Sequence, residues 1–230
     1  AISGLGLTPD FVWPTRDPAP EFFALIEPGY LAQLPKGYEA EESRLANAQA
    51  EAETELLATM TARLSTPMTG LSVIRNARLF DAERAAMRAG RHDVYILRGR
   101  IVSIQPTGEG MHGLPVARSL DAEGRVLLPG LFDMHAHVGR WEGGLNLAAG
   151  VTTVRDMGND NSMLQRVIDE TAEGKVFGPQ IVPTGFLEGE SPYSARSGFV
   201  ISTLDEAKAA VDWYAAHGYP QIKIYNSFPR

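Results

Sequence analysis

The chain has 230 residues, 44% of them hydrophobic and 21% charged, which is typical of a globular protein that can bury a sizeable core. Its net charge of -7 and its lack of a dense Lys and Arg cluster argue against nucleic acid as a partner. Cysteine is absent, which excludes disulfides and thiolate metal ligands, and no apolar run approaches the roughly 20 residues that span a bilayer, so no membrane partner is expected. The cellular compartment stays open.

Residues 1–70 are expected to form an arm followed by a helix. Six of the fifteen prolines lie in residues 1–38, which predicts short elements and mostly extended backbone there. Strong helix formers dominate from about Ala40 to Leu64, so a helix is predicted over that range. Its expected apolar stripe consists of Leu45, Leu56, Leu57, Met60 and Leu64.

Residues 71–126 show a β pattern. Short runs of β-forming residues occupy 71–75, 92–98 and 100–104, and Gly99 between the last two indicates a hairpin. This region is predicted to be a small antiparallel β unit.

Residues 127–230 alternate between strand and helix patterns. The expected strands are 131–134, 151–156, 179–184 and 222–225, with helices near 141–149, near 162–173 and from a capping box at Thr203. This βαβαβαβ order predicts parallel strands joined by helical crossovers. A (β/α)8 barrel needs about 250 residues, so the fold class is α/β, with a partial TIM-type barrel made of its first four strands.

Two histidines end the first barrel strand. His135 and His137 are two residues apart, so their side chains leave one face of a strand and can bind a single metal ion. Asp133 shares this face. The alternative is a pair of strand-edge histidines that hydrogen-bond to backbone or water.

Lys223 lies between two isoleucines in the fourth strand. If Ile222 and Ile224 face the helices, Lys223 points into the barrel, where an ammonium beside a metal ion is unfavourable. Reaction with carbon dioxide would convert the amine into an anionic carbamate that can bridge two metal ions. On an edge strand, Lys223 could instead extend to solvent.

Other polar residues are less informative. Arg155 and Asp156 end the second strand, where they either orient the site or form a structural ion pair. Charged and aromatic residues of the loop after the third strand could contact a substrate, although solvated loop charge is the better interpretation; they are Glu188, Glu190, Tyr193 and Arg196. Three histidines without a partner at ligand spacing are interpreted as structural: His92, His112 and His217.

A cupin barrel is an alternative reading of the histidine pair. Cupins follow the pair with a glutamate, and Glu142 stands at that distance from His137. The predicted helices then intervene where a jelly roll needs strands, so this alternative is rejected.

Three ordered motifs together resemble the amidohydrolase superfamily, in particular its imidazolonepropionase-like and prolidase-like branch. They are Pro129–His137, Gly150–Asp156 and Ile222–Tyr225. The similarity extends over about residues 71–230. It implies a small β-sandwich domain, here 71–126, before a metallo-hydrolase barrel, here 127–230.

The resemblance also implies roles for individual residues. His135 and His137 match the pair that binds the more buried metal, and Lys223 matches the lysine that becomes a carbamate. Tyr225 is the candidate substrate contact. The implied cofactor is zinc or another divalent metal, as one or two ions that activate water, and manganese, nickel and iron suit the same ligands.

The implied activity is hydrolysis of C–N bonds in a small amide, cyclic amide or dipeptide. Family members take further histidines and a catalytic aspartate from later strands, so the general acid/base is expected beyond Arg230 and the chain is expected to be an inactive part of a longer enzyme. Such a half-barrel should aggregate, self-associate or pair with a complementary chain. The alternative function is a binding or structural module without catalysis.

Overall fold

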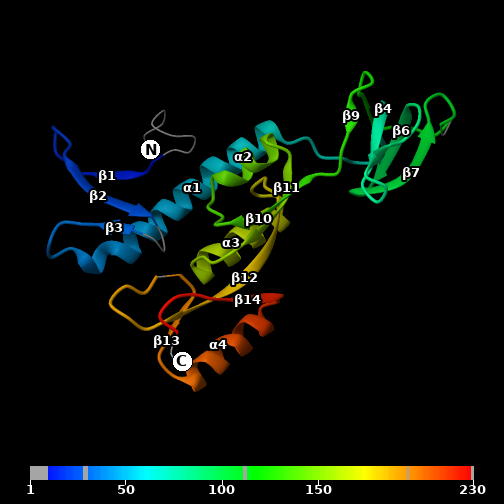
Figure 1. The fold of residues 1–230 in the computed structure, drawn as a ribbon. Coiled ribbons are helices and arrows are strands. Elements are labelled where there is room, and N and C mark those ends of the chain that lie inside the picture. Colours follow the sequence, from blue (N-terminus) through cyan, green and yellow to red (C-terminus); the bar gives the residue numbers. More distant parts are fainter. Residues whose placement is uncertain (1–9, 28–30, 111–112, 196, 229–230) are drawn as a thin grey trace. The chain divides into compact units, whose positions relative to one another are not determined.

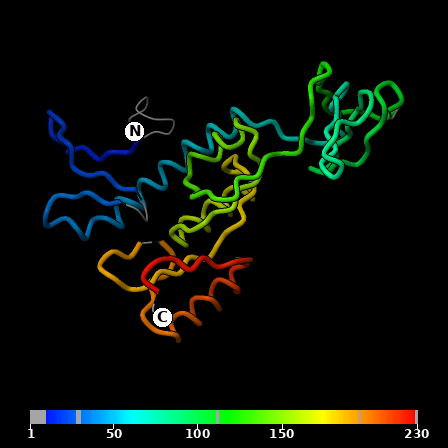
Figure 2. The backbone as a smooth tube through the Cα atoms, viewed as in Figure 1, coloured from blue at the N-terminus to red at the C-terminus, as the bar shows by residue number. Residues whose placement is uncertain are grey.

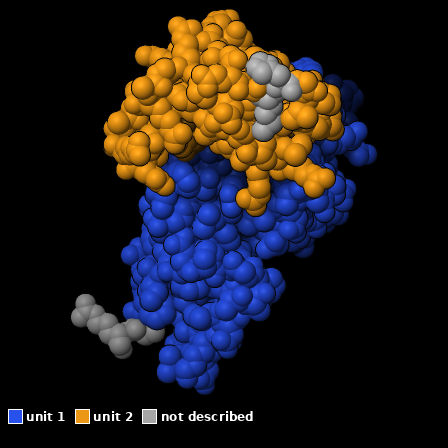
Figure 3. All heavy atoms as spheres, turned by 90° about the vertical axis from the view of Figure 1, so that its right-hand side faces the viewer, with its two compact units in different colours: residues 1–64, 131–230 blue, residues 65–130 orange. Residues whose placement is uncertain are grey.

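The computed structural model describes residues 10–27, 31–110, 113–195 and 197–228 of a mixed α/β chain. The chain divides into two compact units, residues 1–64 with 131–230 and residues 65–130, which Figure 3 colours separately. None of the described helices is long and apolar enough to cross a membrane.

The proline-rich start of the chain contains regular structure. Strands β1 (Val12–Pro14), β2 (Phe22–Glu27) and β3 (Leu31–Gln33) form a three-stranded antiparallel sheet (Figure 1). These strands are short and extended, as the proline content predicted. Ala24 and Ile26 of this sheet pack with Leu45 of the following helix.

Helix α1 (Glu42–Leu64) follows a short 3-10 turn, η1 (Glu39–Glu41). The apolar stripe predicted for it is partly wrong, because Leu56 is 44% exposed and Leu64 is 58% exposed. The buried positions recur every fourth residue and include polar side chains: Leu45, Gln49, Glu53, Leu57 and Thr61. The helix therefore buries a mixed stripe, which needs polar partners.

The second unit is a six-stranded sheet. Its strands are β4 (Ser72–Asp81), β5 (Ala86–Met87), β6 (His92–Leu97), β7 (Arg100–Pro106), β8 (Arg118–Asp121) and β9 (Val126–Leu127). The hairpin of β6 and β7 turns at Gly99, whose φ of 71° suits glycine. The prediction of an antiparallel unit is only partly right, because β8 and β9 pair with β4 in parallel.

The rest of the first unit contains the half-barrel sheet that the sequence predicted. Its parallel strands β10, β11, β12 and β14 pair in that order. The elements in chain order are β10 (Leu131–Ala136), α2 (Glu142–Ala148), β11 (Val151–Asp156), α3 (Asn161–Ala172), β12 (Gln180–Gly189), β13 (Phe199–Ile201), α4 (Leu204–Ala216) and β14 (Gln221–Ile224). Strand β13, which pairs with the end of β12, was not predicted.

Helices α3 and α4 contact β12, as the backbone trace in Figure 2 also shows. Apolar residues of the helices, the strands and the adjoining loops form two core clusters. One consists of Leu164, Leu187, Ala210, Tyr214 and Tyr219, and the other of Val138, Val154 and Val167. The capping box at Thr203 is confirmed, since its hydroxyl accepts from Glu206 N and the Glu206 carboxylate accepts from Thr203 N.

Candidate functional site

The two predicted metal-binding histidines lie together at the end of β10. Ala136 and Val138 pack in the helix-side core, so alternation sends the rings of His135 and His137 to the opposite face. Their centroids are 5.5 Å apart. The backbone N–H of His135 donates to Asp133 Oδ1 over 2.9 Å, which fixes the backbone conformation at the first histidine.

His137 is oriented by a carbonyl. Its Nδ1 lies 2.6 Å from the oxygen of Gly158, which can only accept, so Nδ1 carries the proton. In the neutral form of this ring, Nε2 presents a lone pair. This is the usual arrangement of a histidine that binds a metal through Nε2.

Asp156 holds the loop that provides this carbonyl. The side chain is completely buried and accepts from Val138 N at 2.7 Å, Gly158 N at 3.0 Å and Asn159 Nδ2 at 3.0 Å. It therefore joins the loops after β10 and β11. Among the described residues, neither Asp156 nor Arg155 forms an ion pair, and Arg155 instead donates to Met134 O.

Lys223 lies in β14 opposite Phe186 of β12. Ile222 packs in the helix-side core, as the alternation predicted, whereas Ile224 is 64% exposed. The Lys223 Nζ atom is 5.4 Å from the ring centroid of Phe186 and 4.9 Å from that of Tyr225. No carboxylate of the described ranges forms an ion pair with it.

A cavity of about 700 Å³ adjoins these residues within the first unit. His137, Lys223 and Tyr225 line it, while His135 is not among its lining residues. The region before the barrel supplies a second wall, which the sequence analysis missed: Asp10, Phe11, Leu25, Ile26, Glu27, Gln49 and Glu53. The four-residue spacing of Gln49 and Glu53 within a buried helix face was the available signal.

Arg140 connects the two walls. Its side chain is 7% exposed and donates from Nη1 to Ala50 O at 2.6 Å and from Nη2 to Thr54 Oγ1 at 2.6 Å and Glu170 Oε2 at 2.7 Å. Glu53 Oε2 lies 3.9 Å from Nη1. A buried cation thus ties α1 to α3 and to the loop after β10.

Glu53 is the buried carboxyl of the N-terminal wall. Burial raises its pKa above the ordinary value, and the neighbouring carboxylates Glu142 and Glu170 act in the same direction. A hydrogen bond from Gln49 Nε2, 2.8 Å from Glu53 Oε1, and the charge of Arg140 partly offset this rise in pKa.

The loop residues considered as substrate contacts have different environments. Glu188 is only 1% exposed and accepts from Gly189 N and Ala195 N, so solvated loop charge is wrong for it. Tyr193 is 93% exposed, and Glu190 accepts from Ser202. Arg196 lies outside the described residues.

The histidines interpreted as structural also have different environments. His217 bonds through Nδ1 to Trp213 O at 2.7 Å and stacks on that ring. The buried Nδ1 of His92 has no partner among the described residues. His112 lies outside the described ranges.

The donor set fits a metal only in part. His137 has the ring orientation of a ligand, and His135 adds a second imidazole beside it. Within the described ranges, however, no group of three or more His, Asp and Glu side chains is arranged to hold a metal ion. Lys223 would have to become anionic to contribute.

Comparison with known proteins finds no matching family model. The chain is 29% identical to imidazolonepropionase of Klebsiella pneumoniae (strain 342) over 126 residues, which cover 51% of this chain and 30% of that protein. It is 37% identical to adenine deaminase of Ruegeria sp. (strain TM1040) over 67 residues, or 29% of this chain and 11% of that enzyme.

Solved structures show the same fold. A protein assigned as a prolidase from Bifidobacterium longum matches 71% of this chain and 42% of its own, with a TM-score of 0.61 and 22% identity. A Xaa-Pro dipeptidase with bound methionine matches 67% and 47%, with a TM-score of 0.55 and 20% identity. The chain therefore spans less than half of these proteins and under a third of the imidazolonepropionase.

Proposed function

We propose, from the relationship of part of this chain to the amidohydrolase superfamily, that it carries part of a metal-dependent enzyme that hydrolyses C–N bonds. The observation that carries the proposal is His137, whose Nδ1 is held by Gly158 O and whose Nε2 is therefore available beside the ring of His135.

His135, His137 and the carbamate of Lys223 would hold one or two divalent ions, with zinc as the first choice. Such an ion lowers the pKa of bound water and polarises a substrate carbonyl. The protein keeps His137 in the required tautomer through Gly158, and Asp156 fixes Gly158 in turn. No protein nucleophile is needed.

Lys223 suits carbamate formation because no described carboxylate pairs with it. Its Nζ atom lies 5.4 Å from the Phe186 ring centroid and 4.9 Å from that of Tyr225, at a half-buried position. In the reaction, the neutral amine nitrogen attacks carbon dioxide, and one proton leaves to solvent. The product is a carbamate with one negative charge.

The proposed substrates are small amides, cyclic amides or dipeptides. Tyr225 lines the cavity, is 43% exposed and packs 5.0 Å from Phe186, so it can contact a bound substrate. We further propose domain limits of 1–70, 71–126 and 127–230, with the middle region as part of a β-sandwich.

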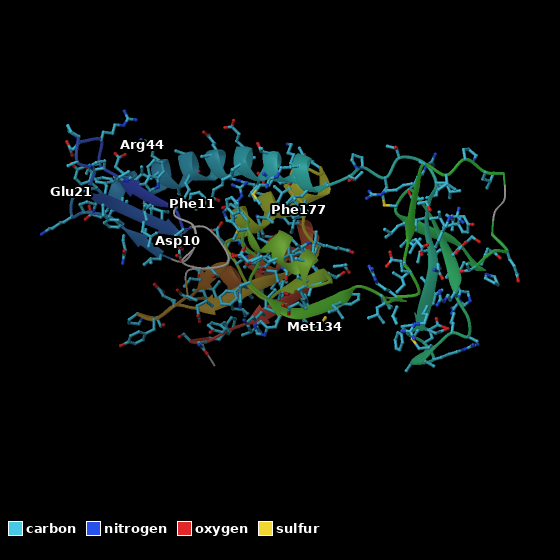
Figure 4. The ribbon with its side chains drawn as sticks, turned by 90° about the horizontal axis from the view of Figure 1, so that it is seen from above. Asp10, Phe11, Glu21, Arg44, Met134 and Phe177 are labelled. Carbon is cyan, nitrogen blue, oxygen red and sulfur yellow. The ribbon has the colours of Figure 1, made fainter. Side chains whose placement is uncertain are left out.

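Association with a complementary chain or a second copy is proposed for the open edge of the half-barrel. On the edge strand β10, Phe132 is 66% exposed and Met134, labelled in Figure 4, is 52% exposed. Large apolar side chains at a strand edge favour association. A monomer by light scattering at high concentration would contradict this proposal.

Zinc binding tests the central assignment. The full chain should retain zinc after gel filtration, and the double variant His135→Ala, His137→Ala should lose it, as measured by elemental analysis. His217→Ala is the matched control, because that ring is already bonded to Trp213. Absence of zinc from the unaltered chain, or equal zinc in the double variant, would refute the metal site.

The carbamate has its own test. With ¹³C-bicarbonate, the chain should show a carbamate carbon signal in NMR that disappears in Lys223→Arg. An unchanged signal would exclude Lys223 as the modified residue. We expect no turnover of amides or dipeptides by the chain alone, because none of its described residues is assigned as the general acid/base; substantial metal-dependent turnover would contradict that expectation.

A non-catalytic binding module is the second candidate. The contacts of Lys223 with two aromatic rings favour it, since they suit an unmodified ammonium. Zinc binding with a carbamate signal would reject this candidate.

A further inference from the structure

The N-terminal wall gives the cavity a partly exposed apolar lining. Phe11 and Leu25 both line the cavity, and each of them is only partly buried. Phe11 stacks on Trp141, which directly precedes α2, with 5.6 Å between the ring centroids. Figure 4 labels Phe11 on the side of the N-terminal sheet that is nearer the barrel strands. Apolar surface from outside the half-barrel is therefore available to a molecule in the cavity.

Buried hydrogen bonds hold this sheet against α1. Gln49 accepts from Trp13 Nε1 at 3.3 Å and donates to Ile26 O at 3.2 Å, so one helix residue binds two strands. Arg140 of the half-barrel donates in turn to Ala50 O of α1 at 2.6 Å. Because these contacts fix the wall before a ligand arrives, binding against it requires little reorganisation.

The cavity is larger than a simple amide group requires. Its volume of about 700 Å³ lies in the range of pockets that hold ligands of moderate size, and such pockets are mostly apolar. Besides the predicted ligands His137 and Lys223, the lining includes apolar side chains that are not fully buried: Phe11, Leu25, Trp141, Met163 and Tyr225. A substrate with a bulky apolar group can therefore remove apolar surface of both molecules from water, which is favourable.

Carboxylates of the same wall select against negative charge. In the register of β1 and β2, Asp10 lies opposite Glu27. Both residues are exposed and line the cavity, and neither forms an ion pair within the described ranges. Of the cations in the described lining, Arg140 is paired with Glu170, and the proposed carbamate removes the positive charge of Lys223. An anionic group bound at this wall would thus be repelled.

We infer that Phe11 and Leu25 are specificity-determining residues, which take an aryl or bulky alkyl group of an uncharged amide. This inference rests on the proposed function and narrows its substrate class. Neutral amides with a bulky apolar group are favoured over free dipeptides, because Asp10 and Glu27 repel a terminal carboxylate.

Three small amides test the inference without a variant. Hippuramide has a phenyl ring and no charge, hippurate has the same ring and a carboxylate, and N-acetylglycinamide has neither the ring nor a charge. In an NMR titration of the full chain with bicarbonate present, hippuramide should bind about tenfold or more tighter than N-acetylglycinamide, because its ring is removed from water. Equal affinities, or no binding of hippuramide, would overturn the inference.

Hippurate tests the exclusion of anions. It should bind about fivefold or more weaker than hippuramide at low salt, and the difference should shrink when added NaCl screens the carboxylates. Glu27→Gln should reduce the difference, whereas Glu21→Gln, the same change at an exposed position outside the lining, should keep it. Hippurate that binds as tightly as hippuramide would overturn the preference for uncharged amides.

Variants of the wall identify the residues that take the ring. Phe11→Ala should lose most of the preference for hippuramide over N-acetylglycinamide. Phe22→Ala is the matched control, because that ring of β2 is 62% exposed and outside the lining. Thermal unfolding establishes that each variant is folded, and Leu25→Ala replaces Phe11→Ala if the latter does not fold. A full preference in the folded variant would show that the wall does not take the ring.

Zinc binding and ring preference fail independently. A chain that binds zinc but holds hippuramide and N-acetylglycinamide equally would retain the proposed function and lose this inference. A chain that never binds zinc but prefers hippuramide would support the apolar subsite and refute the metal site. The ring preference should also persist in the His135→Ala, His137→Ala variant, and its loss there would overturn the assignment of the ring to the N-terminal wall.

Discussion

The two walls of the cavity are built on different physical principles. The half-barrel wall carries His137 directly after β10 and Lys223 on β14, and strand alternation fixes the direction of each side chain. The N-terminal wall carries Glu53 on a helix that is held through the buried side chain of Arg140. The difference teaches that a regular sheet positions its residues by backbone geometry, whereas the added wall depends on a few buried polar contacts.

The largest effect on stability is expected from Arg140→Met, which removes the contacts that hold the N-terminal wall against the half-barrel. Glu53 and Glu170 would remain buried without their cation, at a cost of about 3–5 kcal/mol in the free energy of unfolding. Urea denaturation measures the loss. Arg166→Met, on an exposed position of α3, should change stability by less than about 0.5 kcal/mol, and equal losses would refute the role of the buried pair.

Asp156→Ala tests the half-barrel wall. Three donors lose their buried acceptor, so the free energy of unfolding should fall by about 2–3 kcal/mol. The NMR signals of the His137 ring nitrogens should also change, because Gly158 no longer holds the ring. Asp169→Ala, at an exposed position, is the control, and His137 ring-nitrogen signals in Asp156→Ala identical to those of the unaltered chain would show that Asp156 does not position the ring.

Thr203→Ala should destabilise the half-barrel wall by a smaller amount than Asp156→Ala. Loss of the capping box at the start of α4, which precedes β14, should cost about 1 kcal/mol in chemical denaturation. Thr59→Ala, an exposed change in α1, should have a smaller effect. If Thr59→Ala costs as much as Thr203→Ala, the cap contributes nothing specific.

The smallest expected effect is the pH dependence of stability that Glu53 of the N-terminal wall produces. Burial raises the pKa of Glu53 above about 4.5, so the folded state keeps this proton to higher pH than the unfolded state. Stability from this group therefore falls as pH rises from about 4.5 through the raised pKa, and is constant outside that window. Glu53→Gln should become more stable relative to the unaltered chain over that window, and a difference in the opposite direction would contradict the raised pKa.

Much of the half-barrel was predictable from the sequence because its signals are local. The βαβ alternation, the capping box at Thr203 and the proximity of His135 and His137 each depend on a few neighbouring residues. The extension of β12 to Gly189 and the addition of β13 were not predictable in this way, since they depend on pairing between segments far apart in the chain.

The N-terminal wall escaped prediction for a related reason. The helix was expected to bury Leu56 and Leu64, but its buried face includes Gln49 and Glu53. Hydrophobic periodicity does not identify a polar side chain as buried when its partner, Arg140, lies about ninety positions away in the chain.

The sequence by itself determined the strand and helix order of the barrel region and the common face of its two histidines, because backbone periodicity acts over a few residues. Tertiary structure decided which carboxylates line the cavity and how Gly158 orients His137. Those features arise where distant segments meet, and the cost of burying a polar group is set only by the neighbours that folding brings to it.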